Sequence, residues 1–406
     1  DSGSHQFAND LRTPDATTAA VLATPDLTLL PTAAPLASPV SAADLLQPRG
    51  APSRIYFLRG TELWSLSLAD RQARRIVAPA AGQAIVAYDA SPSGDRAAVA
   101  LGSPNGSAPV AAVQVVDASG RVLQRIDDLA EALKTKLSTP VSVDWSPQGK
   151  AILIGFRDGG IASAPIGGGP PTLLLSPAVA PRPQRAAWSP TGQEFAFLDA
   201  AGSSSLVALY RAAIAASTPA AVAAPTVVAP AGDSAASIDG FAWLPDGGSL
   251  LFTEHGGALG SGSTDLWRAG IDGSGRQLVA SAGVAAPVAQ IRQFAPSTDG
   301  RSVAYAIDVP TDAGPVFNSL WVRDLESGRP MQVPMPTGLS IVRLWWTSAG
   351  LVVEATIRPR AGTPATSQAG TTVLLLASSS GRPEELLRFA THPAATPVAA
   401  TPLATP

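Results

Sequence analysis

The sequence predicts an all-β protein, a single β-propeller of four-stranded antiparallel blades. One observation is a turn motif that recurs six times along the 406 residues: in its full form an aromatic residue, serine and proline precede a glycine, and some copies match it more loosely. The other is that short apolar runs with turn signals between them flank each copy. A repeat of about 43 to 55 residues built from such runs is typical of propeller blades.

Each copy of the motif predicts a hairpin between the first two strands of a blade. Proline pre-sets the backbone dihedral of an early turn position, and glycine supplies the positive φ that closes a short hairpin. The glycines follow one another at intervals of 43 to 55 residues. The six copies run from Ala90 to Gly94, Trp145 to Gly149, Trp188 to Gly192, Trp243 to Gly247, Phe294 to Gly300 and Trp346 to Gly350.

The unit at 138–176 shows the expected blade most clearly. Its apolar runs are Pro140 to Trp145, Lys150 to Phe156, Ile161 to Ile166 and Thr172 to Leu175. Four antiparallel strands within about 40 to 45 residues make one propeller blade.

A large aromatic ring precedes the turn in five of the six copies. These rings are Trp145, Trp188, Trp243, Phe294 and Trp346, while the first copy has Ala90 at this place and Tyr88 two residues earlier. Because the position repeats, we expect the rings to pack between neighbouring blades. A platform for stacking sugars or bases is the alternative.

The repeats predict seven blades. The first unit has three clear strands, Arg54 to Leu58, Glu62 to Leu68 and Arg74 to Val77. Its innermost strand could come from Ala42 to Leu46, or the end of the chain could close the ring and remove the exposed sheet edges. Six blades is the alternative count, if the first and last units combine. The other units span 84–127, 138–176, 182–229, 236–281, 288–335 and 338–390.

Two segments depart from the strand pattern. Residues 127–137 place leucines four apart, with aspartates at the start and lysines near the end, which predicts a short amphipathic helix between the second and third blades. Residues 215–232 are rich in alanine and proline and predict a long loop with one outer strand.

Both ends of the chain are low in complexity. The sequence therefore predicts three parts: an extended N-terminal arm over 1–50, the propeller over 51–390, and a Thr/Pro/Ala-rich tail over 391–406. Segments of this composition are disordered or extended spacers. They suit a protein held off a cell envelope, and they could also serve as arms that lie along partner subunits.

Several blades resemble the TolB-type, WD-repeat-like β-propeller family. The motif at Trp188 followed by Glu194 to Leu198, and the segments from Asp265 to Leu278 and from Ser319 to Gly328, carry the resemblance. The resemblance covers roughly 54–390. It implies the β-propeller fold and a periplasmic, cell-surface or secreted location, but it implies no particular activity. Residues 1–53 do not contain the α/β domain of the family's translocation proteins, and no Gly-x-Ser-x-Gly elbow of its serine peptidases is present.

Composition argues against most catalytic sites. The chain has no cysteine and three histidines, of which only His255 lies in the propeller. Motifs for zinc hydrolases and phosphate-binding loops are absent from the sequence. We therefore expect no catalytic residue, no metal and no cofactor. The net charge of −3 argues against nucleic acid as a partner, and no run of about 18 apolar residues predicts a membrane span.

Propeller ligands usually lie over the central channel, near the starts of the innermost strands. In this sequence the predicted loops that lead into those strands carry Arg182, Arg185, Asp239, Arg292 and Arg343. An arginine-rich channel mouth could bind a carboxylate or an acidic peptide. The alternative is that these are ordinary solvated loop residues.

The sequence thus predicts a non-enzymatic, extracytoplasmic propeller, a protein-binding scaffold or accessory subunit of an envelope-associated complex. Two alternatives remain. A metal-assisted propeller hydrolase or lactonase needs acidic residues and a metal that converge on the channel. A carbohydrate-binding propeller needs exposed tryptophans.

Overall fold

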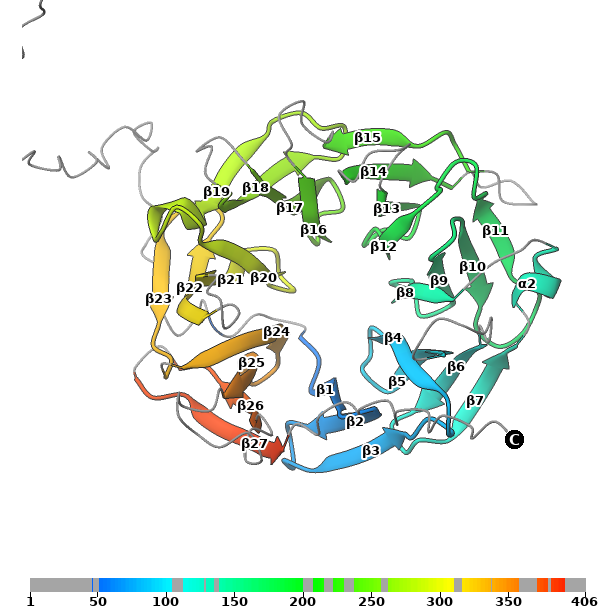
Figure 1. Cartoon of the computed structure of the whole chain (residues 1–406), viewed down its shortest axis with the longest axis horizontal. Helices are drawn as coiled ribbons and strands as arrows, with labels where there is room; N and C mark the ends of the chain where they lie inside the picture. The colour runs from blue at the N-terminus through cyan, green and yellow to red at the C-terminus, as the bar shows by residue number, and fades with distance from the viewer. Residues whose placement is uncertain are drawn as a thin grey trace, which may run out of the picture. The chain divides into compact units, whose positions relative to one another are not determined.

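The chain folds into seven antiparallel sheets that surround a central channel as the blades of a β-propeller (Figure 1). The predicted all-β fold and the count of seven blades are confirmed, and the alternative of six is wrong. The predicted arm over 1–50, except Leu46, and the tail over 391–406 lie outside the described residues. The computed structural model describes Leu46, 51–103, 112–127, 129–134, 139–199, 207–214, 222–229, 237–256, 262–309, 316–336, 338–357, 371–378 and 381–390.

Blades are numbered here in chain order, and each is a run of consecutive strands. Blade 1 contains β1 (Arg54–Arg59), β2 (Glu62–Ser67) and β3 (Ala73–Val77). Blades 2 to 4 contain β4 (Ala84–Ala90), β5 (Arg96–Gly102), β6 (Ala112–Asp117) and β7 (Val122–Ile126); β8 (Pro140–Trp145), β9 (Ala151–Phe156), β10 (Ile161–Pro165) and β11 (Thr172–Leu175); and β12 (Pro183–Trp188), β13 (Glu194–Asp199), β14 (Ala208–Ala213) and β15 (Thr226–Ala229). Blades 5 to 7 contain β16 (Ser237–Trp243), β17 (Ser249–His255), β18 (Thr264–Gly270) and β19 (Gln277–Ser281); β20 (Gln290–Pro296), β21 (Ser302–Val309), β22 (Val316–Asp324) and β23 (Pro330–Val333); and β24 (Leu339–Thr347), β25 (Gly350–Ile357), β26 (Thr371–Leu376) and β27 (Glu384–Ala390).

In blades 2 to 7 the strands pair in chain order, from an innermost strand at the channel to an outermost strand at the rim (Figure 1). Within the described residues blade 1 has three strands, and β1 takes the place that second strands take elsewhere. The predicted innermost strand from Ala42 to Leu46 lies outside the described residues except for Leu46. That residue is buried against blade 7 beside Trp346 and Leu351.

Hydrogen bonds of the turn serine explain the repeated motif. In blade 3, Ser146 Oγ accepts the backbone N–H groups of Lys150 and Ala151 at 3.1 and 3.0 Å. The carbonyl of Ser146 accepts the N–H of Gly149 at 2.8 Å, and Gly149 has a φ of 66°. The serine therefore closes the hairpin from both its backbone and its side chain.

The repeated tryptophans join neighbouring blades. The indole N–H of Trp145 donates to the carbonyl of Asp89 in the preceding blade at 3.1 Å. Trp243 and Trp346 make the same bond to Ala187 and Ala295, at 3.1 and 2.9 Å. Because these three rings are buried between blades, they are not open platforms for stacking sugars.

Blade 6 departs from the alignment that the sequence suggested. There Ser297 accepts the N–H of Gly300 with its carbonyl and that of Ser302 with Oγ, so Ser297 is the turn serine. Pro296, not Phe294, therefore occupies the tryptophan position, and Phe294 corresponds to Tyr88 of blade 2. The assignment of Phe294 was wrong because hydrogen bonds around the serine, rather than the proline, set the register of the turn.

Each of the six described innermost strands contains a β-bulge at the same place. The pairing with the second strand skips one residue, which is the second, third or fourth residue of the innermost strand. A bulge of this kind locally redirects side chains. The skipped residues are Val86, Val141, Gln184, Asp239, Arg292 and Val342.

The predicted helix between blades 2 and 3 is present but shorter than expected. Helix α2 spans Leu129–Ala132, with Leu129 fully buried, and Lys134 follows with a positive φ of 52°. Residues 128 and 135–137 of the prediction lie outside the described residues, as do 215–221 and 230–232 of the predicted long loop. The expected outer strand of that segment is β15. No helix in the described part of the chain is long and apolar enough to cross a membrane.

Candidate functional site

The innermost strands of blades 2 to 7 surround a central cavity of about 630 Å³. Leu58 of β1 contributes to its wall from blade 1. Four charged side chains line it: Asp89 from β4, Asp144 from β8, Arg185 from β12 and Arg343 from β24. The cavity therefore brings together charges from four different blades.

Two of the predicted residues on the innermost strands reach this cavity and two do not. Arg185 and Arg343 each come directly after the skipped residue of their strand, and both line the cavity. Asp239 and Arg292 are themselves skipped residues of β16 and β20, and they are exposed outside the cavity lining. The expectation that these four residues lie on loops was wrong, because each innermost strand begins earlier than the apolar pattern indicates.

Arg182, the fifth predicted residue, directly precedes β12. Its backbone N–H donates to Asp199 Oδ1 at 2.8 Å, so it helps to start the strand. Asp239 interacts with two cationic neighbours instead. Partial burial raises the pKa of its carboxyl, and the charges of His255 and Arg292 oppose that rise.

The two aspartates of the cavity link consecutive blades. Asp89 Oδ2 accepts the backbone N–H of Trp145 at 2.9 Å, and Asp144 Oδ2 accepts that of Trp188 at 2.8 Å. Our sequence reasoning missed both residues. The available signal was that an aspartate directly precedes the tryptophan position in two successive blades, where blades 4 to 6 have alanine.

Burial changes the protonation of these carboxyls. It raises the pKa of Asp89 to about 6, although hydrogen bonds from the Trp145 and Ala90 amides and the charges of Arg185 and Arg343 oppose the rise. The pKa of Asp144 is raised well above its ordinary value by burial and by the negative charge of Asp89. The pair therefore holds protons at a pH where exposed aspartates are ionised.

Arg343 is held by aromatic rings rather than by a carboxylate. Its guanidinium donates to the Tyr88 hydroxyl and lies over the Tyr88 and Trp345 rings, 4.7 and 5.6 Å from their centroids. Its register partner on β25, Glu354, is only 6% exposed. Burial raises the pKa of Glu354 to about 7 against the opposing charge of Arg343.

Arg185 has a similar setting on the other side of the cavity. Its guanidinium lies 5.2 Å from the Phe241 ring centroid. The side chain is solvent-accessible yet closely surrounded by protein, as expected for a group that lines a channel. Burial lowers the pKa of Arg185, and the charges of Asp144 and Asp89 oppose this effect.

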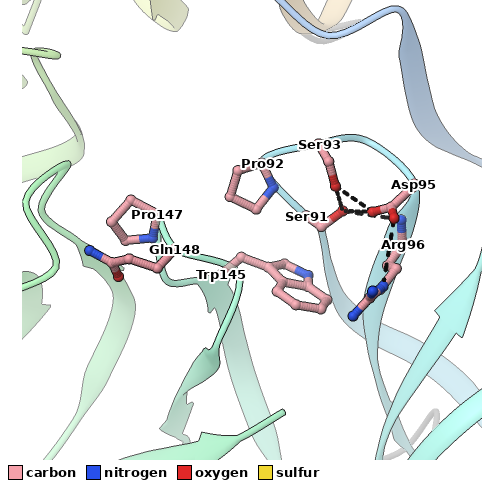
Figure 2. A pocket seen from close by; sticks show the side chains of 9 residues that line it. Ser91, Pro92, Ser93, Asp95, Arg96, Trp145, Pro147 and Gln148 are labelled. Atoms are coloured by element: carbon pink, nitrogen blue, oxygen red, sulfur yellow. Dashed lines mark hydrogen bonds and ion pairs between the residues drawn. The ribbon is translucent and has the colours of Figure 1, made fainter. Parts of the chain in front are cut away.

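A second, smaller hollow of about 300 Å³ lies between the hairpin turns of blades 2 and 3 (Figure 2). Its polar side chains satisfy one another. Asp95 accepts hydrogen bonds from Ser91 and Ser93, and Arg96 lies 3.7 Å from the Asp95 carboxylate. Because these groups already close the turn, this hollow is a weaker candidate than the channel. In the described residues no three His, Asp or Glu side chains are grouped to hold a metal ion.

Comparison with known proteins identifies the fold. No protein-family model and no curated protein matches the sequence. The chain is similar to the solved structure of a prolyl endopeptidase, with a TM-score of 0.55 and 16% identity, over 86% of this chain and 49% of that chain. This chain shares the propeller fold with that protein. It spans about half of the endopeptidase's length, and at this identity the similarity is one of fold alone.

A second similar structure is hydrazine synthase from Kuenenia stuttgartiensis. The TM-score is 0.47 and the identity 12%, over 72% of this chain and 76% of that chain. The function of the propeller must therefore be argued from its own side chains.

Proposed function

We propose that this propeller is a non-enzymatic scaffold or accessory subunit that binds a partner protein over the mouth of its channel. The proposal includes a place outside the cytoplasm, in an envelope-associated complex, and a relation to TolB-type propellers. The repeated turn motif and the Thr/Pro-rich arm and tail support that setting.

The observation that supports partner binding is the ring of six bulges. Since the bulges occur at the same place in every described innermost strand, their side chains surround one end of the channel. Those from blades 7, 2 and 3 are the apolar residues Val342, Val86 and Val141, and those from blades 4, 5 and 6 are polar or charged. Val342 is 44% exposed. An apolar arc facing a charged arc is the composition of a protein interface.

The test is isolation of the tagged protein from gently solubilised envelopes of the host, followed by quantitative mass spectrometry. Val342→Asp places a charge in the apolar arc. Leu123→Asp is the matched control, since Leu123 is 41% exposed on the outermost strand β7, far along the blade from the channel. We expect a stoichiometric partner that wild type and Leu123→Asp retain and Val342→Asp loses.

Two outcomes contradict the proposal. One is that wild type is isolated without a stoichiometric partner. The other is that a partner binds Val342→Asp as well as it binds the control, which would place the interface elsewhere on the ring.

A further inference from the structure

The charged side chains of the channel lie at two levels along the innermost strands. The first level consists of the residue that directly follows the bulge in each of the six described innermost strands. It contains arginine in blades 4 and 7, and its four other residues are uncharged. Two residues further, next to the turns, the level has aspartate in blades 2 and 3. The residues of the first level are Ala87, Ser142, Arg185, Gly240, Gln293 and Arg343, and those of the second are Asp89, Asp144, Ala187, Ala242, Ala295 and Trp345.

The two arginines interact with Asp89, Asp144 and Glu354 only at longer range and form no salt bridge in the described part of the chain. Among the described residues, neither Arg185 nor Arg343 lies within 4.0 Å of a carboxylate oxygen, and their like charges repel each other across the cavity. The aspartates instead use one oxygen each to accept a backbone N–H of the next blade. Two like charges that face one cavity are unfavourable, and an anion placed near both would relieve their repulsion.

We propose that the central cavity is a binding site for a carboxylate group, held by the guanidinium groups of Arg185 and Arg343. The planar guanidinium matches a carboxylate with two parallel hydrogen bonds. Arg343 is pre-positioned by the Tyr88 and Trp345 rings, which reduces the entropy lost when the ligand binds. The volume of about 630 Å³ admits a small dicarboxylic acid or the acidic side chain of an inserted peptide.

Affinity should depend on pH because other titratable groups face the arginines. These are Tyr88 and Asp89 from β4, Asp144 from β8 and Glu354 from β25. Burial raises the pKa of Asp89 to about 6 and that of Glu354 to about 7, and it also raises those of Asp144 and Tyr88. Tyr88 therefore stays neutral, while the three carboxyls take up protons as pH falls.

The direction in which affinity changes with pH follows from the charges in the cavity. Ionised Asp89 and Glu354 repel an incoming carboxylate, and protonation of both groups as the pH falls from 7.5 to 5.5 reduces that repulsion. An ordinary ligand carboxyl, with a pKa near ~4, stays ionised over this range. Each coupled proton changes affinity by at most about tenfold per pH unit, so we expect binding to tighten at least ~5-fold from pH 7.5 to 5.5.

The experiment is isothermal titration calorimetry on the full chain at pH 7.5 and 5.5. One probe is glutarate, and the other is an end-capped peptide with two adjacent glutamates. Binding of glutarate identifies a small-molecule ligand, and binding of the peptide alone identifies an acidic segment of a protein. Either result supports the site, provided that Arg185→Gln and Arg343→Gln each weaken binding at least ~10-fold.

Two further variants distinguish loss of the binding site from loss of the folded structure. Arg292→Gln removes an arginine that does not line the cavity, and we expect it to bind as wild type does. Asp89→Asn keeps an acceptor for the Trp145 N–H but removes a charge, so it should bind more tightly at pH 7.5 and lose part of the pH dependence. Thermal unfolding of each variant verifies that it is folded.

The inference is overturned if neither probe binds at either pH, or if folded Arg185→Gln and Arg343→Gln bind as wild type does. Weaker binding at pH 5.5 than at pH 7.5 would contradict the role of Asp89 and Glu354. The proposed partner interface is tested by a different experiment, the isolation of a bound protein with Val342→Asp, although Val342 also contributes to the lining of the cavity.

Discussion

At the scale of single residues, blades are joined by polar contacts as well as by apolar packing. An aspartate of one blade accepts a backbone N–H of the next, and an indole N–H of the later blade donates back to a carbonyl of the earlier one. Between blades 2 and 3 both bonds are present. Each satisfies a polar group that packing would otherwise leave buried without a partner.

Trp243 and Trp188 offer a comparison that measures the indole bond. Trp243 donates to Ala187, whereas the buried indole nitrogen of Trp188 has no hydrogen-bond partner in the described structure. Both Trp→Phe changes lose ring volume, but only Trp243→Phe also leaves a carbonyl unpaired. We expect Trp243→Phe to lower the free energy of unfolding by about 1 to 2 kcal/mol more than Trp188→Phe. Urea denaturation at pH 7.5 provides the measurement, and equal losses would rule out a stabilising role for the bond.

At the scale of elements, hairpin turns of one blade lie against the outer strand of its neighbour. The turn between β18 and β19 has two glycines with similar left-handed backbones, Gly273 at φ 80° and Gly275 at φ 61°. A Cβ at Gly273 would lie 2.7 Å from the backbone oxygen of Val228 in β15, whereas a Cβ at Gly275 would meet no atom within 4 Å. Gly273 thus allows the blades to approach closely.

These two glycines make a matched pair for mutation. Both alanine variants bear the cost of a left-handed conformation, which is about 1 kcal/mol. Gly273→Ala must also displace the backbone of the neighbouring blade, so we expect it to cost at least about 1 kcal/mol more than Gly275→Ala. Chemical denaturation of both variants tests this, and a Gly275→Ala variant that is the less stable of the two would contradict it.

At the scale of the whole molecule, the ring closes between blades 1 and 7 by side-chain packing. In the described structure no strand is exchanged between them, since blade 7 takes all four strands from the C-terminal part of the chain. Phe57 and Phe389 stack across the junction with centroids 5.5 Å apart, and Ser348 N–H donates to the carbonyl of Pro52 at 3.0 Å. We call this contact the seam. Its apolar cluster includes Ile55, Phe57, Leu66, Val352, Leu374 and Phe389.

Removal of one aromatic side chain from the seam should therefore destabilise the contact that closes the propeller. Phe389 is 5% exposed, and we expect Phe389→Ala to cost about 3 to 5 kcal/mol. Arg71→Ala is the control, because its ion pair with Glu384 bridges the same seam at 3.1 Å but is solvent-exposed and worth less than about 1 kcal/mol. Denaturant midpoints and limited proteolysis compare the two, and similar effects would mean that packing at the seam does not determine stability.

The sequence predicted the parts of this molecule that depend on local repetition. Turn chemistry and apolar runs place the strands of all seven blades, because each blade repeats the same short-range signals. The bulges were not predictable, since skipped residues as different as Val86, Asp239 and Arg292 occupy the same position. Their common cause is the geometry of the ring rather than a side-chain preference.

The candidate site was predictable only in part for the same reason. Arg185 and Arg343 were expected at the channel, whereas Asp89 and Asp144 were missed because their role depends on which blade follows theirs. Arg182, Asp239 and Arg292 were grouped with Arg185 and Arg343 because each lies near the predicted start of an innermost strand. The bulge alone does not decide which side chains reach the cavity, since the skipped residues Val86, Val141 and Val342 also line it.

The seam also determines how the ring would respond to mechanical force. Tension applied through the chain segments that flank β1 and β27 would load the contact between blades 1 and 7 before any other. Within the described structure that contact is resisted by stacked rings, a backbone hydrogen bond and a surface ion pair, not by a ladder of strand pairing. Rings and ion pairs separate over short distances, so within the described structure we expect this contact to yield before the hydrogen-bonded strands inside each blade do.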